Sequence, residues 1–243
     1  MSSNAVSAGR PIARPATRSG SAARLSGGTF AVLLALAGLL IIVATDQVAP
    51  ATSDRQAQLR IWLAARAAGF TSLLLLAVQV SLGLVLSHPT NKSTWKLSKL
   101  LFPWHENAWV FVMAFLAAHI VSIMADEYAN VGVLGALVPG LSEYRSSAVA
   151  LGTLSLYALL VAGVTARYTR LLPSGLWLRL HRLSLVIFAL AWLHGVLAGT
   201  DSVVASGFYG ATGTLVLGAG AYRYWVSRQA RPTFSTTLQE TSR

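Results

Sequence analysis

Residues 104–119 read WHENAWVFVMAFLAAH, and residues 181–194 read HRLSLVIFALAWLH. Each apolar run has a histidine near both ends, so that His105 and His119 lie 14 positions apart, whereas His181 and His194 lie 13 apart. At about 1.5 Å of rise per residue, each spacing covers roughly 20 Å along a helix. Two such helices running in the same direction would bring the four imidazoles together as two pairs at two depths.

The composition is typical of a membrane protein. Of the 243 residues, 54% are hydrophobic and 11% are charged, and the mean hydropathy is +0.59. The net charge of +11 would suggest nucleic-acid binding in a soluble protein, but here the cations lie between apolar runs, so we expect no nucleic-acid partner. The absence of cysteine excludes disulfides, thiolate-held iron–sulfur clusters and covalent c-type haem.

Six apolar runs are long enough to cross a bilayer, which requires about 17–25 residues. The expected fold is an all-α polytopic membrane bundle with six transmembrane helices and both termini in the cytoplasm. The spans are expected at 29–45, 61–87, 104–125, 146–166, 180–199 and 208–226. They form one domain, 29–226, between a disordered basic tail at 1–28 and a short cytoplasmic tail at 227–243. The first run also resembles a cleaved signal peptide, but its long basic region and long apolar core favour a retained helix.

The distribution of charge sets the expected orientation. With the N-terminus inside, the inner segments hold 15 Lys and Arg against two acids, whereas the outer side holds four Arg against six acids. This asymmetry follows the positive-inside rule. Spans three and five then both run from inside to outside, which places His105 and His181 at an inner level. His119 and His194 lie at an outer level.

Two imidazoles that face each other between helices can occupy both axial positions of a haem iron. The sequence therefore predicts two non-covalent, bis-histidine haem b groups. The inner pair is His105 and His181, and the outer pair is His119 and His194. One geometrical difficulty concerns the 13-residue spacing, which turns the second histidine about 140° away from the first on a straight helix. Tighter winding with a local 3₁₀ stretch, a bent entry turn near Leu180, or haems at different azimuths would each resolve it.

Two glycines are expected beside the haems. Gly69 and Gly83 on the second span are also 14 positions apart, and they fall at the outer and inner levels respectively. Without side chains, they would let a macrocycle approach the backbone. The alternative is ordinary packing of small residues between helices, and the sequence leaves both open.

Cations and one aromatic residue complete the predicted haem contacts. Arg66 and Arg145 at the outer level, and Arg182 at the inner level, would pair with anionic propionates. Arg66 lies inside the membrane, where a charge needs a partner, so a propionate or a nearby carboxylate is expected beside it. Trp192, close to His194, would pack on the outer haem.

The order and spacing of these residues resemble the ferric reductase-like transmembrane domain family, the haem core of ferric reductases and NADPH oxidases. The resemblance covers about residues 60–226. The similar features are the two histidine spacings, L-W-x-x-L-H at 176–181, R-x-x-G at 66–69, and Tyr144-Arg145. It implies an oxidoreductase subunit of a bacterial plasma membrane. Such a subunit carries electrons from an inner donor through both haems to an outer acceptor.

Two departures from the family pattern affect the partners. Larger relatives continue into a flavin- and NAD(P)H-binding domain, whereas 17 residues follow Val226 here. We therefore expect a separate donor, either a flavoprotein that carries the flavin or a membrane quinol. Glu106 stands where relatives would have a basic residue, which affects the inner propionate contacts. Ferric chelates, oxygen, quinone and a periplasmic protein all remain open as the outer acceptor.

A proton-coupled transporter that uses the histidines as a relay is the alternative function. Such relays usually need carboxylates within the membrane, and the predicted spans contain little besides the peripheral Glu106. Transporters also tend to have helices that are broken near the midplane, for which the sequence has no clear signal. Electron transfer is therefore the favoured function.

Overall fold

The computed structural model describes residues 52–87, 95–173, 175–199 and 203–229, together with single positions between 29 and 47. Within these ranges all regular elements are helical, which confirms the expected all-α class. Four of the described helical segments are long and apolar enough to cross a membrane, namely Leu59–Leu86, Lys96–Ala125, Ser146–Arg167 and Leu176–Ala198. The expected N-terminal tail, residues 230–243 of the expected C-terminal tail and most of the expected first span lie outside the described residues, whereas residues 227–229 are described and helical.

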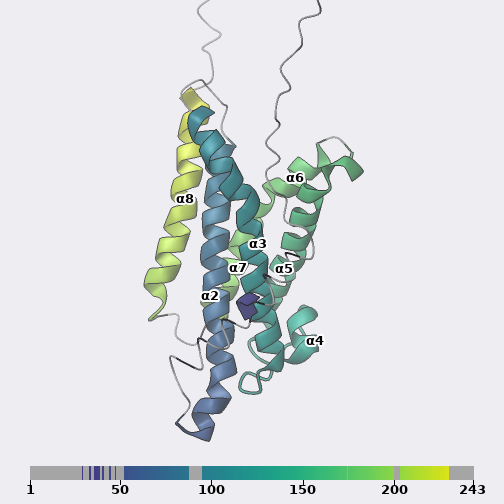
Figure 1. Cartoon of the computed structure of the whole chain (residues 1–243), viewed down its shortest axis with the longest axis vertical. Helices are drawn as coiled ribbons and strands as arrows, with labels where there is room; N and C mark the ends of the chain where they lie inside the picture. Colours follow the sequence, from purple (N-terminus) through teal and green to yellow (C-terminus); the bar gives the residue numbers. More distant parts are fainter. Residues whose placement is uncertain are drawn as a thin grey trace, which may run out of the picture.

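The helix α2 (Asp54–Leu86) runs through the centre of the bundle (Figure 1). Ser53 caps its first turn in an extended conformation and accepts a hydrogen bond from the Gln56 amide. The Gln56 side chain in turn accepts one from the Thr52 amide. These reciprocal bonds satisfy backbone groups that a helix end leaves unpaired. The span expected at 61–87 corresponds to the apolar part of this helix.

The helix α3 (Trp95–Ala125) begins nine residues before the expected third span. The expected span began at Trp104, directly after Pro103, whereas this proline lies inside the helix. A proline removes one helical hydrogen bond, and membrane helices tolerate this because other groups satisfy the freed backbone. The Asn107 amide donates a hydrogen bond to the Pro103 carbonyl over a distance of 2.8 Å. The predicted start was therefore wrong, although the histidine-bearing part of the helix lies where it was expected.

Two helices follow α3 in the chain. The short α4 (Gly132–Leu137) lies against α5 (Ser146–Arg167), which returns along the bundle (Figure 1). Thr153 and Tyr157 of α5 donate hydrogen bonds to the carbonyls of Ala136 and Leu137, at 3.0 and 2.5 Å. These bonds attach α4 to the side of α5 and satisfy carbonyls at its C-terminal end.

The fifth expected span is divided into two helices. After the 3₁₀ turn η1 (Thr169–Leu171), α6 (Leu176–Arg182) and α7 (Ser184–Ala198) meet at Leu183. The Leu183 amide bonds to the Leu180 carbonyl at 3.0 Å, which is the i to i+3 pattern of a 3₁₀ turn. A 3₁₀ turn rotates the chain further per residue than an α-helix does. Two of the explanations offered for the 13-residue spacing between His181 and His194, a bent entry turn and a local 3₁₀ turn, thus occur together.

The last described helix is α8 (Ser206–Gln229), which packs along α2 (Figure 1). It covers the expected sixth span at 208–226 but is not among the four candidate spans. Its glycines, tyrosines and threonines lower its hydropathy relative to the other long helices.

α2 and α5 pack against different sets of helices, and both of them contact α7. α2 contacts α3, α7 and α8, whereas α5 contacts α6 and α7. Buried hydroxyls link neighbours, because Ser72 donates to the Val112 carbonyl at 3.4 Å and Ser155 donates to the Ile187 carbonyl at 3.0 Å. Large apolar side chains on the outside of the bundle are exposed, among them Val121, Val161 and Leu217. Such an apolar exterior suits a lipid bilayer environment.

Candidate functional site

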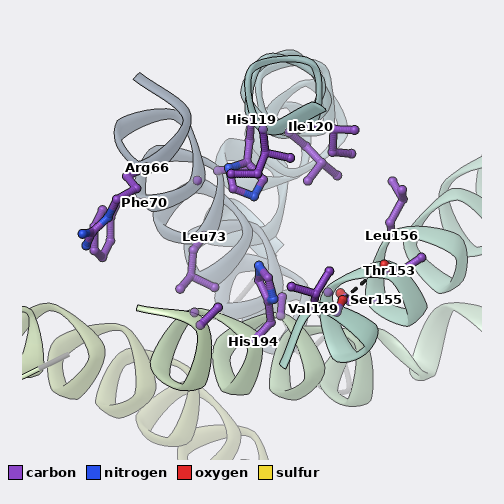
Figure 2. Close-up of a pocket in the computed structure, with 18 of the residues that line it drawn as sticks. Arg66, Phe70, Leu73, His119, Ile120, Val149, Thr153, Ser155, Leu156 and His194 are labelled. Carbon is purple, nitrogen blue, oxygen red and sulfur yellow. Dashed lines mark hydrogen bonds between the residues drawn. The ribbon is translucent and has the colours of Figure 1, made fainter. Parts of the chain in front are cut away.

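The four histidines form two facing pairs. In the inner pair, the ring centres of His105 on α3 and His181 on α6 lie 6.0 Å apart. In the outer pair, the ring centres of His119 on α3 and His194 on α7 lie 6.2 Å apart. The ring planes cross at 86° and 69° respectively. Figure 2 shows the outer imidazoles pointing toward each other from opposite sides of a cavity. The structure therefore brings together the same pairs that the sequence predicted.

Three of the four imidazoles are oriented by backbone carbonyls. The Nδ1 atom of His105 lies 3.0 Å from the Gln79 carbonyl oxygen, and that of His119 lies 2.7 Å from the Ala65 oxygen. On the other side of the bundle, the Nδ1 atom of His194 lies 2.8 Å from the carbonyl oxygen of Ala148 on α5. A carbonyl can only accept, so in each case Nδ1–H donates and Nε2 keeps its lone pair. This is the tautomer that a metal-ligating histidine requires at Nε2.

The same three rings lie against glycines. A Cβ atom at Gly69 would lie 3.0 Å from His119 Nδ1, and one at Gly83 would lie 3.0 Å from His105 Cε1. A Cβ atom at Gly152 would lie 2.8 Å from His194 Nδ1. Real Cβ atoms essentially never come closer than 3.0 Å, so a side chain at Gly152 would displace the His194 ring, whereas one at Gly69 or Gly83 would be a tight contact. Gly69 and Gly83 thus let imidazole rings approach the backbone of α2, and the approach of a macrocycle stays a prediction.

Gly152 is a residue that sequence reasoning missed. It lies one helical turn after Ala148, the residue whose carbonyl orients His194. The same relation holds on α2, where Gly69 follows Ala65 and Gly83 follows Gln79 by four residues. A glycine four residues after the residue whose carbonyl accepts the Nδ1–H bond thus recurs at three of the rings. The sequence signal for Gly152 is that it is a glycine inside an apolar span. Gly163 on the same helix has the same property, so this signal does not distinguish the two glycines.

His181 is held differently from the other three. Neither ring nitrogen has a hydrogen-bond partner in the part of the chain that the structure describes. Its aromatic neighbour besides His105 is Trp177, one turn earlier on α6, with ring centres 6.1 Å apart and planes tilted by 48°. No residue of α6 is buried. The inner pair therefore consists of one oriented imidazole and one that the backbone does not orient.

A large aromatic residue lies between the two levels. Trp109 of α3 reaches α5, where a Cβ atom at Gly163 would collide with the indole ring. The ring therefore fills the space between α3 and α5 one helical turn from His105. Any substitution at Gly163 would force this indole to move.

The outer pair lies in a cavity with a volume of ≈ 180 Å³. Its walls come from α2, α3, α4, α5, α7 and α8, together with Val131, which precedes α4. Arg66 lines it, with its guanidinium carbon 5.8 and 5.6 Å from the ring centres of Trp62 and Phe70. Figure 2 places Arg66 and Phe70 together to one side of the histidines. Arg66 is thus at the outer level, where the sequence predicted it.

The other two predicted arginines do not line this cavity. Arg145 caps the end of α7, because its Nη1 donates to the carbonyls of Leu197 and Gly199 at 2.6 and 3.1 Å. Tyr144 assists by donating its hydroxyl to the Ala198 carbonyl at 2.8 Å. These bonds satisfy carbonyls that the helix leaves unpaired at its C-terminus. Arg145 therefore caps α7, whereas Arg182 is exposed at the end of α6, and propionate contacts of the two residues stay predictions.

Trp192 also lies elsewhere than predicted. Its indole N–H donates to the Tyr209 carbonyl at 3.0 Å, and its ring meets the Tyr209 ring at 82° with centres 6.1 Å apart. It does not line the cavity beside His194. Neighbouring helix positions point about 100° apart, so Trp192 and His194 diverge by roughly 160°. The indole therefore joins α7 to α8 and does not pack on the histidine pair.

Comparison with known proteins adds no relative. No family model, no curated protein and no solved structure matches the chain.

Proposed function

We propose that the chain is a di-haem b-type membrane cytochrome of the ferric reductase-like kind, an electron-transfer subunit of an oxidoreductase. In this proposal the chain has six spans and lies in a bacterial plasma membrane with both termini cytoplasmic. The inner pair binds one haem, and the outer pair binds the other. The single observation that carries the proposal is the presence of two facing imidazole pairs at two levels of one bundle.

The distance between the rings supports haem ligation. A metal–imidazole bond is about 2 Å long, and the ligating nitrogen lies about 1 Å from its ring centre. Two imidazoles on opposite sides of one iron therefore have ring centres roughly 6 Å apart. The separations of 6.0 and 6.2 Å agree with this value.

The donor set also fits a haem. No group of three or more His, Cys, Asp or Glu that could hold a bare metal ion occurs in the described part of the chain. Two imidazoles would leave a bare ion poorly coordinated, whereas a porphyrin supplies its own four nitrogens. Because Nδ1 of His105, His119 and His194 bonds to a carbonyl, Nε2 of each ring keeps the lone pair that binds iron. When bound, each haem supplies an iron that accepts and releases one electron.

The protein's contribution is to hold the two sites at a fixed separation across the membrane. The 14 residues between His105 and His119 on α3 correspond to about 21 Å of helix. Electrons would enter at the inner level from a separate flavoprotein or from membrane quinol, and leave to an acceptor on the outer face. Arg66, inside the apolar bundle beside the outer pair, is the cation best placed for an outer propionate.

The test is the haem content of the purified chain. After expression with haem supply and purification in detergent, oxidised and dithionite-reduced spectra should have low-spin b-type bands, with about two haems per chain. His105→Leu and His181→Leu should each remove the inner haem, and His119→Leu and His194→Leu the outer one. His88→Leu, the one other histidine, is the matched control and should keep both.

The contrary outcome is equally clear. A folded, monodisperse chain without a Soret band after full haem supply would refute haem binding. The four histidines would then be tested as a proton relay, by measuring substrate-dependent proton uptake in proteoliposomes. Loss of haem from the His88→Leu variant would show that the assay reports folding and not ligation.

A further inference from the structure

A second cavity lies between α2 and α8, and we call it the α2–α8 groove. Its volume is ≈ 500 Å³, and it shares no lining residue with the cavity of the outer histidine pair. Val78 and Leu215 at its edges are exposed on the outside of the bundle, so the groove is reached from the lipid side. Each helix contributes one stripe of residues at helical spacing. The two stripes are Val78, Ser81 and Val85 on α2, and Thr214, Gly218 and Tyr222 on α8.

Ser81 is the buried polar residue of this groove. It is 7% exposed, and its Oγ atom has no hydrogen-bond partner in the part of the chain that the structure describes. The buried hydroxyls of Ser72 and Ser155, by contrast, each donate to a carbonyl of a neighbouring helix. A buried hydroxyl without a partner destabilises the folded chain, so a molecule that bonds to it gains affinity.

The lining of the groove restricts what can bind there. None of its described residues is charged, so the headgroup of a phospholipid would find no counter-charge. A hydrocarbon chain alone would leave the Ser81 hydroxyl unpaired. A neutral ring with oxygen substituents and an apolar tail avoids both problems, and it reaches the groove through the bilayer. This combination is the chemistry of a quinol.

The groove and the inner histidine pair lie on opposite sides of α2. Ser81 is two residues after Gln79, whose carbonyl accepts the hydrogen bond from His105 Nδ1, and two residues before Gly83, which contacts the same ring. Positions two residues apart on a helix differ in direction by about 200°. A molecule beside Ser81 is therefore separated from His105 by roughly the diameter of one helix, about 10 Å.

We infer that the α2–α8 groove binds a membrane quinol, which supplies the electrons that enter at the inner level. This inference rests on the proposed haem function and selects between the two donors named there. The two O–H bonds of the quinol break and a quinone forms. Its two electrons reduce the inner ferric iron one after the other, the second after the first has moved to the outer haem. The two protons leave to water on the inner side, and Ser81 positions the ring by a hydrogen bond to one of its oxygens.

The first test is photolabelling, whose readout requires neither haem nor electron transfer. The full chain in detergent is illuminated with an azido derivative of a short-tailed ubiquinone, and the labelled peptides are identified by mass spectrometry. Labels should fall on α2 and α8 around Ser81 and Thr214, and an excess of decylubiquinone should remove them. If these peptides carry no label, a lipid, another segment of this chain or a second copy fills the groove, and the inference is overturned.

Two glycines of α8 provide a matched pair of blocking variants. Nothing lies within 4 Å of a Cβ atom added at Gly218 or at Gly220, but Gly218 lines the groove and Gly220 does not. Gly218→Leu should therefore abolish both the labelling and the anaerobic reduction of the haems by decylubiquinol. Gly220→Leu should retain both, and dithionite should reduce the haems of either variant. Unchanged labelling in Gly218→Leu, or equal losses in the two variants, would refute the site.

Ser81→Ala tests the hydrogen bond separately from the space. Loss of one neutral hydrogen bond should weaken the competition of decylubiquinone for labelling by about two- to tenfold. Ser81→Thr keeps the hydroxyl and should compete nearly as well as the unmodified chain. Because Ser81 Oγ has no partner in the described residues, its removal should not impair folding. Equal competition in the alanine variant would contradict the role of Ser81.

The two proposals fail in different ways. If no Soret band forms after full haem supply, the proposed haem function is wrong, and photolabelling alone then decides whether the groove binds a quinone. If two haems bind and dithionite reduces them, but decylubiquinol does not, the cytochrome proposal stands and the quinol inference is overturned.

Discussion

The outer and inner histidine pairs have almost the same separation but very different support. Both outer rings are oriented by backbone carbonyls and rest on glycines of a neighbouring helix. At the inner level this holds for His105 alone, whereas His181 lies on a short helix beside Trp177. The difference teaches that ligand geometry and ligand rigidity are separate properties, which depend on different residues. The following predictions separate them, beginning with the largest expected effect.

Gly152→Ala should break the outer site. The added Cβ atom would lie 2.8 Å from His194 Nδ1 and 2.9 Å from its Cε1 and Cγ, so the ring must leave its place and lose the Ala148 carbonyl. We expect about 10–100-fold weaker haem binding at the outer level, measured as haem retained after dialysis against apomyoglobin. Gly210→Ala is the matched control, because nothing lies within 4 Å of its position. Full retention of both haems in the Gly152 variant would contradict the structural role of this glycine.

Arg145→Ala should weaken the anchoring of α7 without changing the ligands. It removes two hydrogen bonds to carbonyls at the helix end, each contributing about 1 kcal/mol to stability. The measurement is thermal unfolding in detergent, followed by circular dichroism. Arg145 also has a left-handed backbone with φ of 43°, so Arg145→Gly should lose less stability than Arg145→Ala. Equal losses in the two variants would mean that backbone strain contributes nothing here.

Trp192→Phe should have the smallest effect, and it tests the contact between α7 and α8. The substitution removes the bond from the indole N–H to the Tyr209 carbonyl, which costs about 0.5–1.5 kcal/mol, while keeping an aromatic ring. Because Trp192 does not line the outer cavity, the Soret and α-band maxima should not move. A shifted outer-haem spectrum in this variant would restore the sequence-based prediction that Trp192 packs on the haem.

The comparison of the two levels also explains which parts of the site could be predicted from sequence. The pairing of His105 with His181 and of His119 with His194 follows from spacing, span order and charge distribution, all of which are local or additive properties. The roles of Arg145 and Trp192 could not be predicted in this way. Both residues lie near the right depth, but depth does not define the direction in which a side chain points. Arg145 bonds to the end of α7, and Trp192 points toward α8.

The division at Leu183 is a second feature that the sequence only partly revealed. The 13-residue spacing required an adjustment somewhere between His181 and His194, but three explanations were consistent with it. The choice depends on how α6 and α7 pack against α5, which is a property of the assembled bundle. Gly152 was missed for a similar reason, because its role exists only when α7 brings His194 beside it.

The sequence by itself determined that the chain is helical and membrane-like, and that four histidines lie at two matched depths. Hydropathy, charge and residue spacing act along the chain, so they are readable without a fold. The tertiary structure alone decided which imidazoles are locked, because a carbonyl and a glycine on one helix hold a ring from another. That locking depends on contacts of a few ångströms between segments about 26 to 54 residues apart. No local pattern encodes such contacts, and they are what distinguishes the outer pair from the inner one.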